Sequence, residues 1–265
     1  MATTCPMNFN VSYLRDQVRN TYDQVARDPN RHYHFHRGSD YAHSFLGYDL
    51  EELDALPALS TERFAGVGNP LAIGTVEPGE TVLDHACGAG MDLLLAARRV
   101  GAEGHGIGID MTPAMVECAR TAADQAGMTD RVEVHQGFYE DLPVANASVD
   151  VVISNGVLNL APDKQQVLGE ISRVLKPGGM LYLADVVVQR ELTEDARSNP
   201  DLWAACVAGA LVEDELVMLA TECGLAEGRV VQRFNCFYDT TAEAKVAKDL
   251  FIQSVNFYAR KAADA

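Results

Sequence analysis

Hydrophobic positions divide the chain into two parts with different periods. In residues 10–27 they recur at steps of three and four, which predicts an amphipathic helix that an Asp-Pro pair ends. From residue 81 to about residue 190, short apolar runs alternate with segments of helical period, the pattern of βαβ units around a parallel sheet. We therefore expect an N-terminal helical cap and substrate-covering segment, residues 1–78, on a Rossmann-like α/β domain, residues 79–265.

Charge and composition argue against several classes of partner. The net charge of −17 disfavours a nucleic-acid interface and docking on an anionic membrane. No apolar run approaches the roughly 20 residues that span a bilayer, and the first ten residues lack the features of a signal peptide. The six cysteines show no CxxC spacing, which favours a reducing compartment over a disulfide framework. We expect a cytoplasmic monomer or homodimer without a metal site.

A glycine-rich turn follows the first predicted strand. The segment "TVLDHACGAG" runs through Asp84 into a turn where Gly88 and Gly90 let the backbone approach a ligand, with the N–H groups of the next helix pointing toward it. The alternative is a tight β–α turn without a ligand. The next strand ends at Asp110, where a carboxylate is placed to accept both hydroxyls of a ribose. These features predict a nucleotide-binding edge.

The segment "SNGVLNL" follows another buried strand and places Gly156 at its carboxyl end. A glycine there either leaves room where a doubly wound sheet keeps its chemistry or serves a positive φ angle. We favour the first interpretation, which predicts near-normal stability for Gly156→Ala and activity that falls as the side chain grows. The neighbouring amides of Asn155 and Asn159 either touch a ligand or stabilise the turn.

The order of five motifs carries a family resemblance. "VLDHACGAG", "GIDMTPAM", "GFYEDLP", "VISNGVLNL" and "RVLKPGG" resemble class I S-adenosylmethionine-dependent methyltransferases across residues 80–190. The resemblance implies S-adenosyl-L-methionine as cofactor and a doubly wound, mostly parallel, seven-stranded sheet with an antiparallel C-terminal edge strand. Two strand-like segments after Gly228, joined by a charged helix at residues 241–250, would complete that sheet.

The same resemblance implies roles for individual residues. Asp84 and the backbone of the turn that follows it would meet the methionine moiety, Asp110 the ribose, and Met111 the adenine. Phe138, after Gly137, stands where the family often has an acidic residue, so the loop backbone would take its place at the adenine. The implied cofactor-binding residues are Asp84, Ala86, Cys87, Gly88, Gly90, Asp110, Met111, Gly137, Phe138 and Asn155.

Longer segments between residues 46 and 216 are similar to arsenite methyltransferases, whose cysteines hold trivalent arsenic. Gly156 and Val67 stand at two of those cysteine positions, and Cys206 alone matches a site thiol. We therefore expect another small-molecule acceptor, preferably a thiol or other soft nucleophile, with Cys206 as the catalytic and substrate-site thiol. The alternatives are an arsenite methyltransferase that uses Cys206 with exogenous thiols, and a non-catalytic, cofactor-binding regulatory module. For Cys206 itself, the alternative is a small buried helix residue.

Histidines and aromatics alternate in "RHYHFH", residues 31–36. A strand-like period of two would place His32, His34 and His36 on one face, as a general base or as metal ligands. The alternative is a solvated surface loop. With Arg37, which follows, and Tyr41, a residue for a lid, these histidines complete the expected substrate residues: His34, His36, Arg37, Tyr41, Gly156, Asn159 and Cys206.

Overall fold

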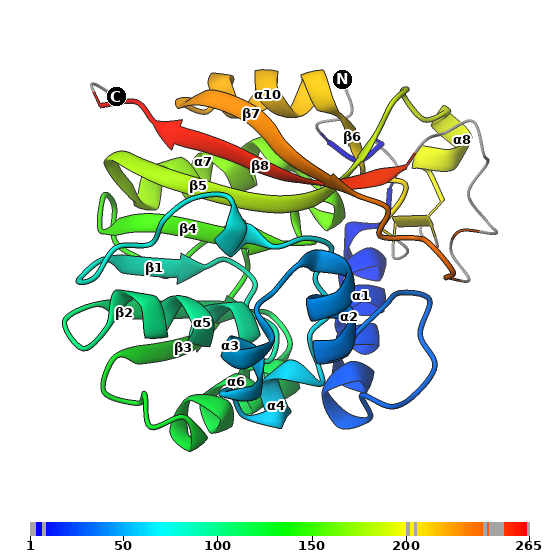
Figure 1. The fold of residues 1–265 in the computed structure, drawn as a ribbon. Coiled ribbons are helices and arrows are strands. Elements are labelled where there is room, and N and C mark those ends of the chain that lie inside the picture. Colours follow the sequence, from blue (N-terminus) through cyan, green and yellow to red (C-terminus); the bar gives the residue numbers. More distant parts are fainter. Residues whose placement is uncertain are drawn as a thin grey trace.

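The structure, a computed structural model, describes residues 4–6, 9–199, 202–203, 206–240, 243 and 252–263. The segment 241–250, which was predicted to be a charged helix, lies outside the described residues except for Glu243. The core is a sheet with the strand order β3-β2-β1-β4-β5-β8-β7 (Figure 1). The strands are β1 (Thr81–Asp84), β2 (His105–Asp110), β3 (Val132–Gln136), β4 (Val149–Asn155), β5 (Leu175–Val188), β6 (Leu211–Val212), β7 (Leu225–Phe234) and β8 (Gln253–Lys261).

The predicted fold class is confirmed, because β1 to β5 pair in parallel and β8 runs antiparallel to β5. Two details differ from the prediction. The two-residue strand β6 adds an eighth strand beside β5, and β8 lies one place inside the edge, which β7 forms. Val255, Phe257 and Ala259 of β8 are fully buried. The run 254–257 of β8 is buried on both faces, as in a strand inside a sheet, whereas β7 is buried only at its two ends and is partly or fully exposed between them.

Helices cover both faces of the sheet and its carboxyl-terminal edge. The predicted amphipathic helix is confirmed as α1, whose stripe of Leu14, Val18 and Val25 is buried and which lies along α6. Figure 1 shows α1 and α2 on the side toward which the β1 arrow points. The helices are α1 (Val11–Arg27), α2 (Gly38–Leu46), α3 (Leu50–Asp54), α4 (Ala58–Thr61), α5 (Met91–Val100), α6 (Pro113–Gln125), α7 (Lys164–Val174), α8 (Glu194–Arg197) and α10 (Glu213–Glu222), with 3-10 turns η1 (Pro70–Ala72) and η2 (Leu158–Leu160). Among the described residues, no helix has the length and apolar character needed to cross a membrane.

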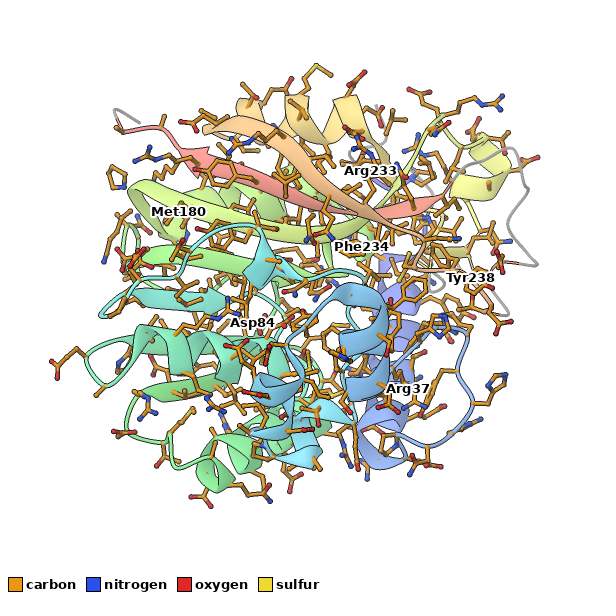
Figure 2. The ribbon with its side chains drawn as sticks, viewed as in Figure 1. Arg37, Asp84, Met180, Arg233, Phe234 and Tyr238 are labelled. Carbon is orange, nitrogen blue, oxygen red and sulfur yellow. The ribbon has the colours of Figure 1, made fainter. Side chains whose placement is uncertain are left out.

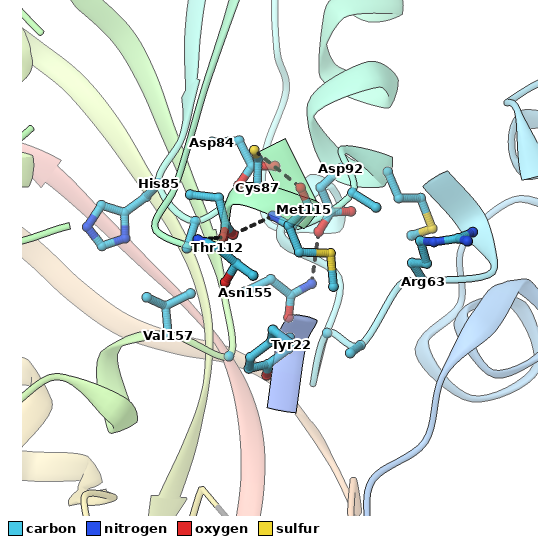
Figure 3. A pocket seen from close by; sticks show the side chains of 18 of the residues that line it. Tyr22, Arg63, Asp84, His85, Cys87, Asp92, Thr112, Met115, Asn155 and Val157 are labelled. Carbon is cyan, nitrogen blue, oxygen red and sulfur yellow. Dashed lines mark hydrogen bonds between the residues drawn. The ribbon is translucent and has the colours of Figure 1, made fainter. Parts of the chain in front are cut away.

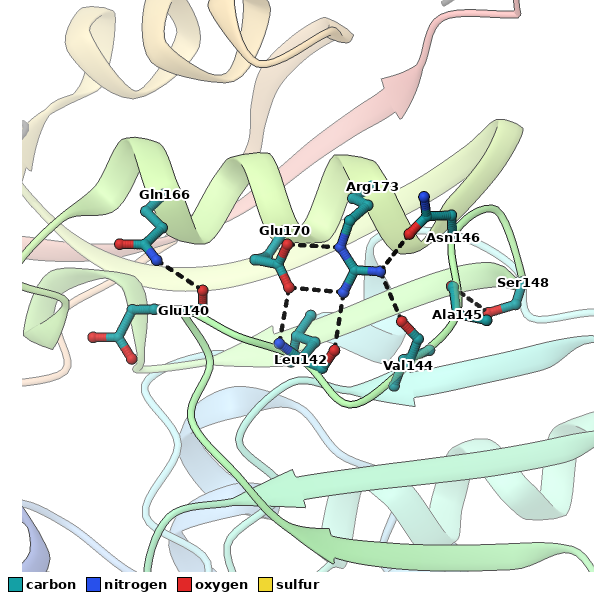
Figure 4. A network of polar contacts seen from close by, with 9 residues as sticks. All are labelled: Glu140, Leu142, Val144, Ala145, Asn146, Ser148, Gln166, Glu170 and Arg173. Carbon is teal, nitrogen blue, oxygen red and sulfur yellow. Dashed lines mark hydrogen bonds and ion pairs between the residues drawn. The ribbon is translucent and has the colours of Figure 1, made fainter.

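Arg173 of α7 fixes the connection between β3 and β4. Its guanidinium pairs with Glu170 at 2.6 Å and donates to the carbonyl oxygens of Leu142 at 2.9 Å and Val144 at 2.7 Å (Figure 4). Glu170 also accepts a hydrogen bond from the backbone N–H of Leu142 at 2.8 Å. Because the same connection begins with Gly137, this network holds one wall of the pocket described below.

Candidate functional site

A pocket of about 840 Å³, its open mouth included, lies at the carboxyl ends of β1, β2 and β4 (Figure 3). The turn after β1, the start of α5 and the ends of β2 and β4 supply its walls. From the N-terminal part of the chain, Val18 and Tyr22 of α1 and a loop that includes Phe64 and Gly66 close it. The strand ends of a doubly wound sheet are where such folds bind their ligands, and the volume suits a small molecule.

Three acidic side chains contribute to the walls of this pocket. Asp84, Asp92 and Asp110 line it and are buried, and within the described residues none of them forms an ion pair with Lys or Arg. Arg63, which also lines the pocket, instead lies 3.8 Å from Glu62. Burial raises the pKa of Asp84 well above its usual range, and the neighbouring carboxylates add to this shift. Buried carboxylates that lack a counter-charge favour a cationic ligand.

Asp110 organises the glycine-rich turn. One carboxylate oxygen accepts the backbone N–H of Gly88 at 2.9 Å, and the other accepts that of Thr112 at 2.8 Å. Gly88 has φ +51° and open space where a Cβ would lie, so this turn needs glycine and keeps its backbone accessible. Burial raises the pKa of Asp110, and these two N–H donors oppose the shift by favouring the ionised form.

Two of the expected cofactor residues lie elsewhere. Gly90 does not line the pocket, and its Cβ would lie 3.3 Å from that of Ala119, so it serves the close approach of α5 to α6. Phe138 is 47% exposed, with the guanidinium of Arg15 5.3 Å from its ring centre, because a large apolar side chain here packs against a surface cation. The residues that do line the pocket as expected are Asp84, Ala86, Cys87, Gly88, Asp110, Met111, Gly137 and Asn155.

Asn155 joins the end of β4 to the N-terminal part of the chain. Its amide donates to Asp92 at 2.9 Å and to the carbonyl of Gly68 at 3.0 Å, and its carbonyl accepts the N–H of Val67 at 2.8 Å. The Tyr48 hydroxyl donates to the other oxygen of Asp92 at 2.7 Å. Burial raises the pKa of Asp92 to about 6, and these two donors oppose the shift.

Gly156 lines the pocket at its boundary with a second space. Its φ is +74°, and a Cβ would meet Val67 at 3.5 Å, an ordinary contact. A positive φ of this size disfavours every residue with a side chain. The φ angle therefore favours the second interpretation of Gly156, a backbone requirement, over the expectation that it leaves room with near-normal stability after Gly156→Ala. The backbone needs glycine here.

Asn159 does not line the pocket, contrary to expectation. It is buried, and its amide donates to Asp185 at 2.7 Å. The same carboxylate accepts the backbone N–H groups of Val157 at 3.1 Å, Leu158 at 2.7 Å and Asn159 at 3.2 Å. The turn-stabilising interpretation of Asn159 therefore holds, because its side chain is used to hold the strand exit.

The second space, here called the side chamber, shares Tyr22, Ala65, Gly66 and Gly156 with the pocket. Four of the expected substrate residues besides Gly156 line it. Among the described residues that line it, none is Asp, Glu, Lys or Arg. The described residues that line the side chamber are Tyr22, His34, Phe35, His36, Tyr41, Ala65, Gly66, Val67, Gly156, Cys206, Cys236 and Phe237.

Two cysteines lie in the side chamber, whereas the sequence pointed to one. Burial raises the pKa of the Cys206 thiol far above its usual range and that of Cys236 to about 12, so both are protonated thiols near neutral pH. Cys206 has φ +61°, which is uncommon for a residue with a side chain. Cys236 belongs to no motif in the sequence. It follows β7, and the place of β7 in the sheet depends on residues far away in the chain, so the sequence alone did not place this thiol in the chamber.

The histidine segment is not a strand, so the predicted alternation of faces does not apply to it. Tyr33 and Phe35 stack at 5.5 Å, and His36 stacks on Tyr41 at 4.9 Å. His34, His36 and Tyr41 reach the side chamber, whereas Arg37 lines an open groove outside it. Across the described ranges, no group of three or more His, Cys, Asp or Glu residues comes together to hold a metal ion. The metal-ligand interpretation of the histidines therefore loses its support.

Comparison with known proteins adds a family and several relatives. The family described as "Methyltransferase domain" matches residues 76–234. The arsenite methyltransferase of Halobacterium salinarum is 45% identical over 181 residues, 68% of this chain and 45% of its own length. That of Homo sapiens is 42% identical over 158 residues, 57% of this chain and 42% of its own length. The chain thus spans less than half the length of these two relatives.

Solved structures agree with this assignment. An arsenic(III) S-adenosylmethionine methyltransferase from Chlamydomonas reinhardtii has a TM-score of 0.72 at 33% identity, and the match covers 80% of this chain and 73% of that one. A geranyl diphosphate methyltransferase solved with geranyl diphosphate and sinefungin has a TM-score of 0.64 at 19% identity, which shows a shared fold.

Proposed function

The chain belongs to the methyltransferase domain family, and from this premise we propose that it is an S-adenosylmethionine-dependent enzyme that methylates a small molecule at a soft nucleophilic atom, preferably a thiol. The feature that carries this proposal is the side chamber, which adjoins the carboxylate-lined pocket at Gly156.

The pocket suits the cofactor in charge and shape. Its three buried carboxylates lack a cationic partner among the described residues, and they match a ligand that bears a sulfonium and an ammonium group. Asp84 and the turn from Ala86 to Gly88 would hold the methionine end, Asp110 the ribose, and Met111 with Gly137 the adenine. When bound, the cofactor would supply a methyl group on positively charged sulfur. Its transfer to the acceptor thiol would leave the cofactor as a neutral thioether, and the thiol proton would pass to a base or to water.

The chain's contribution is to position the acceptor and receive its proton. Displacement at a methyl carbon is accelerated chiefly by holding the two reacting atoms at near-attack distance. The ring nitrogen Nε2 of His36 lies 2.6 Å from the carbonyl oxygen of Tyr238. A carbonyl only accepts hydrogen bonds, so Nε2 carries a proton, and Nδ1 is the ring nitrogen that would take a thiol proton. His36, and not Cys206, is therefore the base that we assign to the acceptor.

Arsenite is the second candidate acceptor, because Cys206 and Cys236 both line the side chamber. Trivalent arsenic prefers thiolate ligands, and the described part of the chamber offers two thiols. An exogenous thiol would complete three sulfur ligands, and the two relatives above are named as arsenite methyltransferases. Binding would have to displace protons from both buried thiols, because burial favours their neutral form.

An acceptor panel tests these candidates. The purified protein is given S-adenosylmethionine with thiols, selenols, phenols, or arsenite with and without glutathione, and S-adenosylhomocysteine is measured. We expect turnover with thiols, unaffected by the double change Cys206→Ser and Cys236→Ser, and little arsenite methylation without glutathione. Cys223→Ser on the surface of the fold is the matched control. Arsenite turnover that needs both chamber cysteines would establish the second candidate, and no product with any acceptor would leave a cofactor-binding regulatory module.

A further inference from the structure

An open groove lies next to the side chamber, on the outside of the molecule. Phe35 and His36 line both spaces, so the groove and the side chamber adjoin at these two residues. Arg31 and Arg37 line the groove from the segment before α2, and Asp239 lines it from the segment after β7. Figure 2 shows Arg37 and Tyr238 on the same side of the molecule, opposite Met180 of β5. The pocket, the side chamber and the groove thus follow one another outward from the strand ends.

The two arginines of the groove are held by neutral groups. Arg37 donates to the carbonyl oxygen of Arg31 at 3.0 Å, and its guanidinium lies 4.7 Å from the ring centre of Tyr33. Arg31 donates to the side-chain oxygen of Gln24 at 3.0 Å. Neither forms an ion pair with a carboxylate of the described residues. Each guanidinium has five N–H donors, so most of them remain for another partner.

These free cations are notable in a chain whose net charge is −17. Elsewhere on the surface, arginines such as Arg27 and Arg233 pair with a carboxylate at 2.7 and 2.8 Å. The acidic residue of the groove, Asp239, is exposed to water, and it forms no ion pair with either arginine within the described ranges. Asp28 also acts on Arg37 from beside the groove, and Glu243 accepts the backbone N–H of Asp239 at 2.8 Å, so the groove would attract an anion through the unused donors of its guanidinium groups and not through an excess of positive charge.

The side chamber and the groove favour opposite ends of one molecule. The described residues that line the chamber are aromatic rings, histidines, thiols and small residues, without Asp, Glu, Lys or Arg. The groove offers guanidinium groups, which bind carboxylates in a bidentate geometry. Resting on the proposed thiol methylation, we infer that the acceptor is a mercaptocarboxylic acid, with its thiol end in the chamber and its carboxylate on Arg31 and Arg37.

The test compares a mercaptocarboxylic acid with the matching carboxamide, which has the same thiol and size but no charge. Activity is followed for the wild type, Arg37→Gln, Arg31→Gln and the control Arg229→Gln, an exposed arginine of β7 that likewise lies over a tyrosine, 4.1 Å from the ring centre of Tyr258. We expect Arg37→Gln to raise KM for the acid about tenfold, the loss of one charge-assisted contact. The amide KM, kcat and cofactor affinity should stay unchanged, as should every value for Arg229→Gln.

A second measurement separates this inference from the proposed function. Calorimetry in the presence of S-adenosylhomocysteine gives the affinity for the acid and the amide without turnover. Tighter binding of the acid, lost in Arg37→Gln, supports the groove even if no thiol is methylated. Equal affinity for acid and amide in the wild type, or an equal loss of both in Arg37→Gln, overturns the inference even if thiols are methylated. Melting temperatures of all variants exclude a loss of folding as the cause.

Discussion

Replacing Gly156 by alanine tests how the strand exit is built. The residue has φ +74°, and its N–H donates to the carbonyl of Ala184 at 2.8 Å, so the chain is held in this conformation. A residue with a Cβ pays about 1–2 kcal/mol in the left-handed region. The added methyl group would lie 3.5 Å from Val67 and costs no further steric energy. We expect Gly156→Ala to lower the free energy of unfolding by about 1 kcal/mol net of the entropy that alanine removes from the unfolded chain.

The assay is thermal and urea unfolding beside cofactor affinity and turnover. One kilocalorie corresponds to about 2–4 °C in the melting temperature of a chain somewhat shorter than this one. Gly156→Asn provides the comparison, because asparagine tolerates positive φ better than alanine although it is larger. Gly169 in α7 provides the control of opposite sign: it has no positive φ and open space at its Cβ, so Gly169→Ala should stabilise the helix by about 0.5–1 kcal/mol.

The two variants at Gly156 separate backbone strain from lost space. If strain dominates stability, alanine is the less stable variant, while asparagine loses more activity because its side chain projects toward the side chamber. An unchanged melting temperature for Gly156→Ala would refute the backbone argument. A stability that falls with side-chain size, asparagine below alanine, would refute it as well and restore the interpretation that the site needs empty space.

Three further perturbations follow from the buried carboxylates. Asp110→Ala should weaken S-adenosylmethionine binding by about 1–3 kcal/mol, the cost of leaving polar groups without their charged acceptor, and calorimetry with unchanged affinity would remove Asp110 from the ribose site. Burial raises the pKa of Asp92 to about 6 in the folded protein. The protonated carboxyl group therefore stabilises the fold fully below about pH 4. As the pH rises through 6 the group ionises, and the free energy of unfolding falls by about 3 kcal/mol. In urea unfolding from pH 4 to 7, Asp92→Asn should not show this fall in the free energy of unfolding. Identical pH profiles for the variant and the wild type would contradict the raised pKa of Asp92. Asp185→Asn should lower the free energy of unfolding by about 1–3 kcal/mol, because its carboxylate accepts three backbone N–H groups at the exit of β4; Asp163→Asn, the N-cap of α7, is the control and should cost a few tenths of a kcal/mol, since asparagine caps as well as aspartate.

Local patterns in the sequence account for the parallel core and for the cofactor edge. Strand periodicity and helix stops are short-range signals, so they predicted β1 to β5, α1 and α5 to α7 in outline, whereas α2 lies in a segment whose sequence looks irregular. Asp84 and Asp110 could be found because both end a parallel strand, and such ends meet at one edge of the sheet. The position of β8 between β5 and β7 was missed, because the order of strands depends on pairing between segments that are far apart in the chain.

Tertiary structure decided the residues that connect distant segments. Asp92 sits in an ordinary helical pattern, and its partners Tyr48 and Asn155 are 44 and 63 residues away. Cys236 reaches the side chamber from beyond β7, and Arg37 lies outside it although the neighbouring His36 lines it. A sequence pattern reports the local period of burial. It contains no information about which distant side chains end within hydrogen-bond distance, or about the φ of Gly156, because these depend on how the packed elements are finally placed.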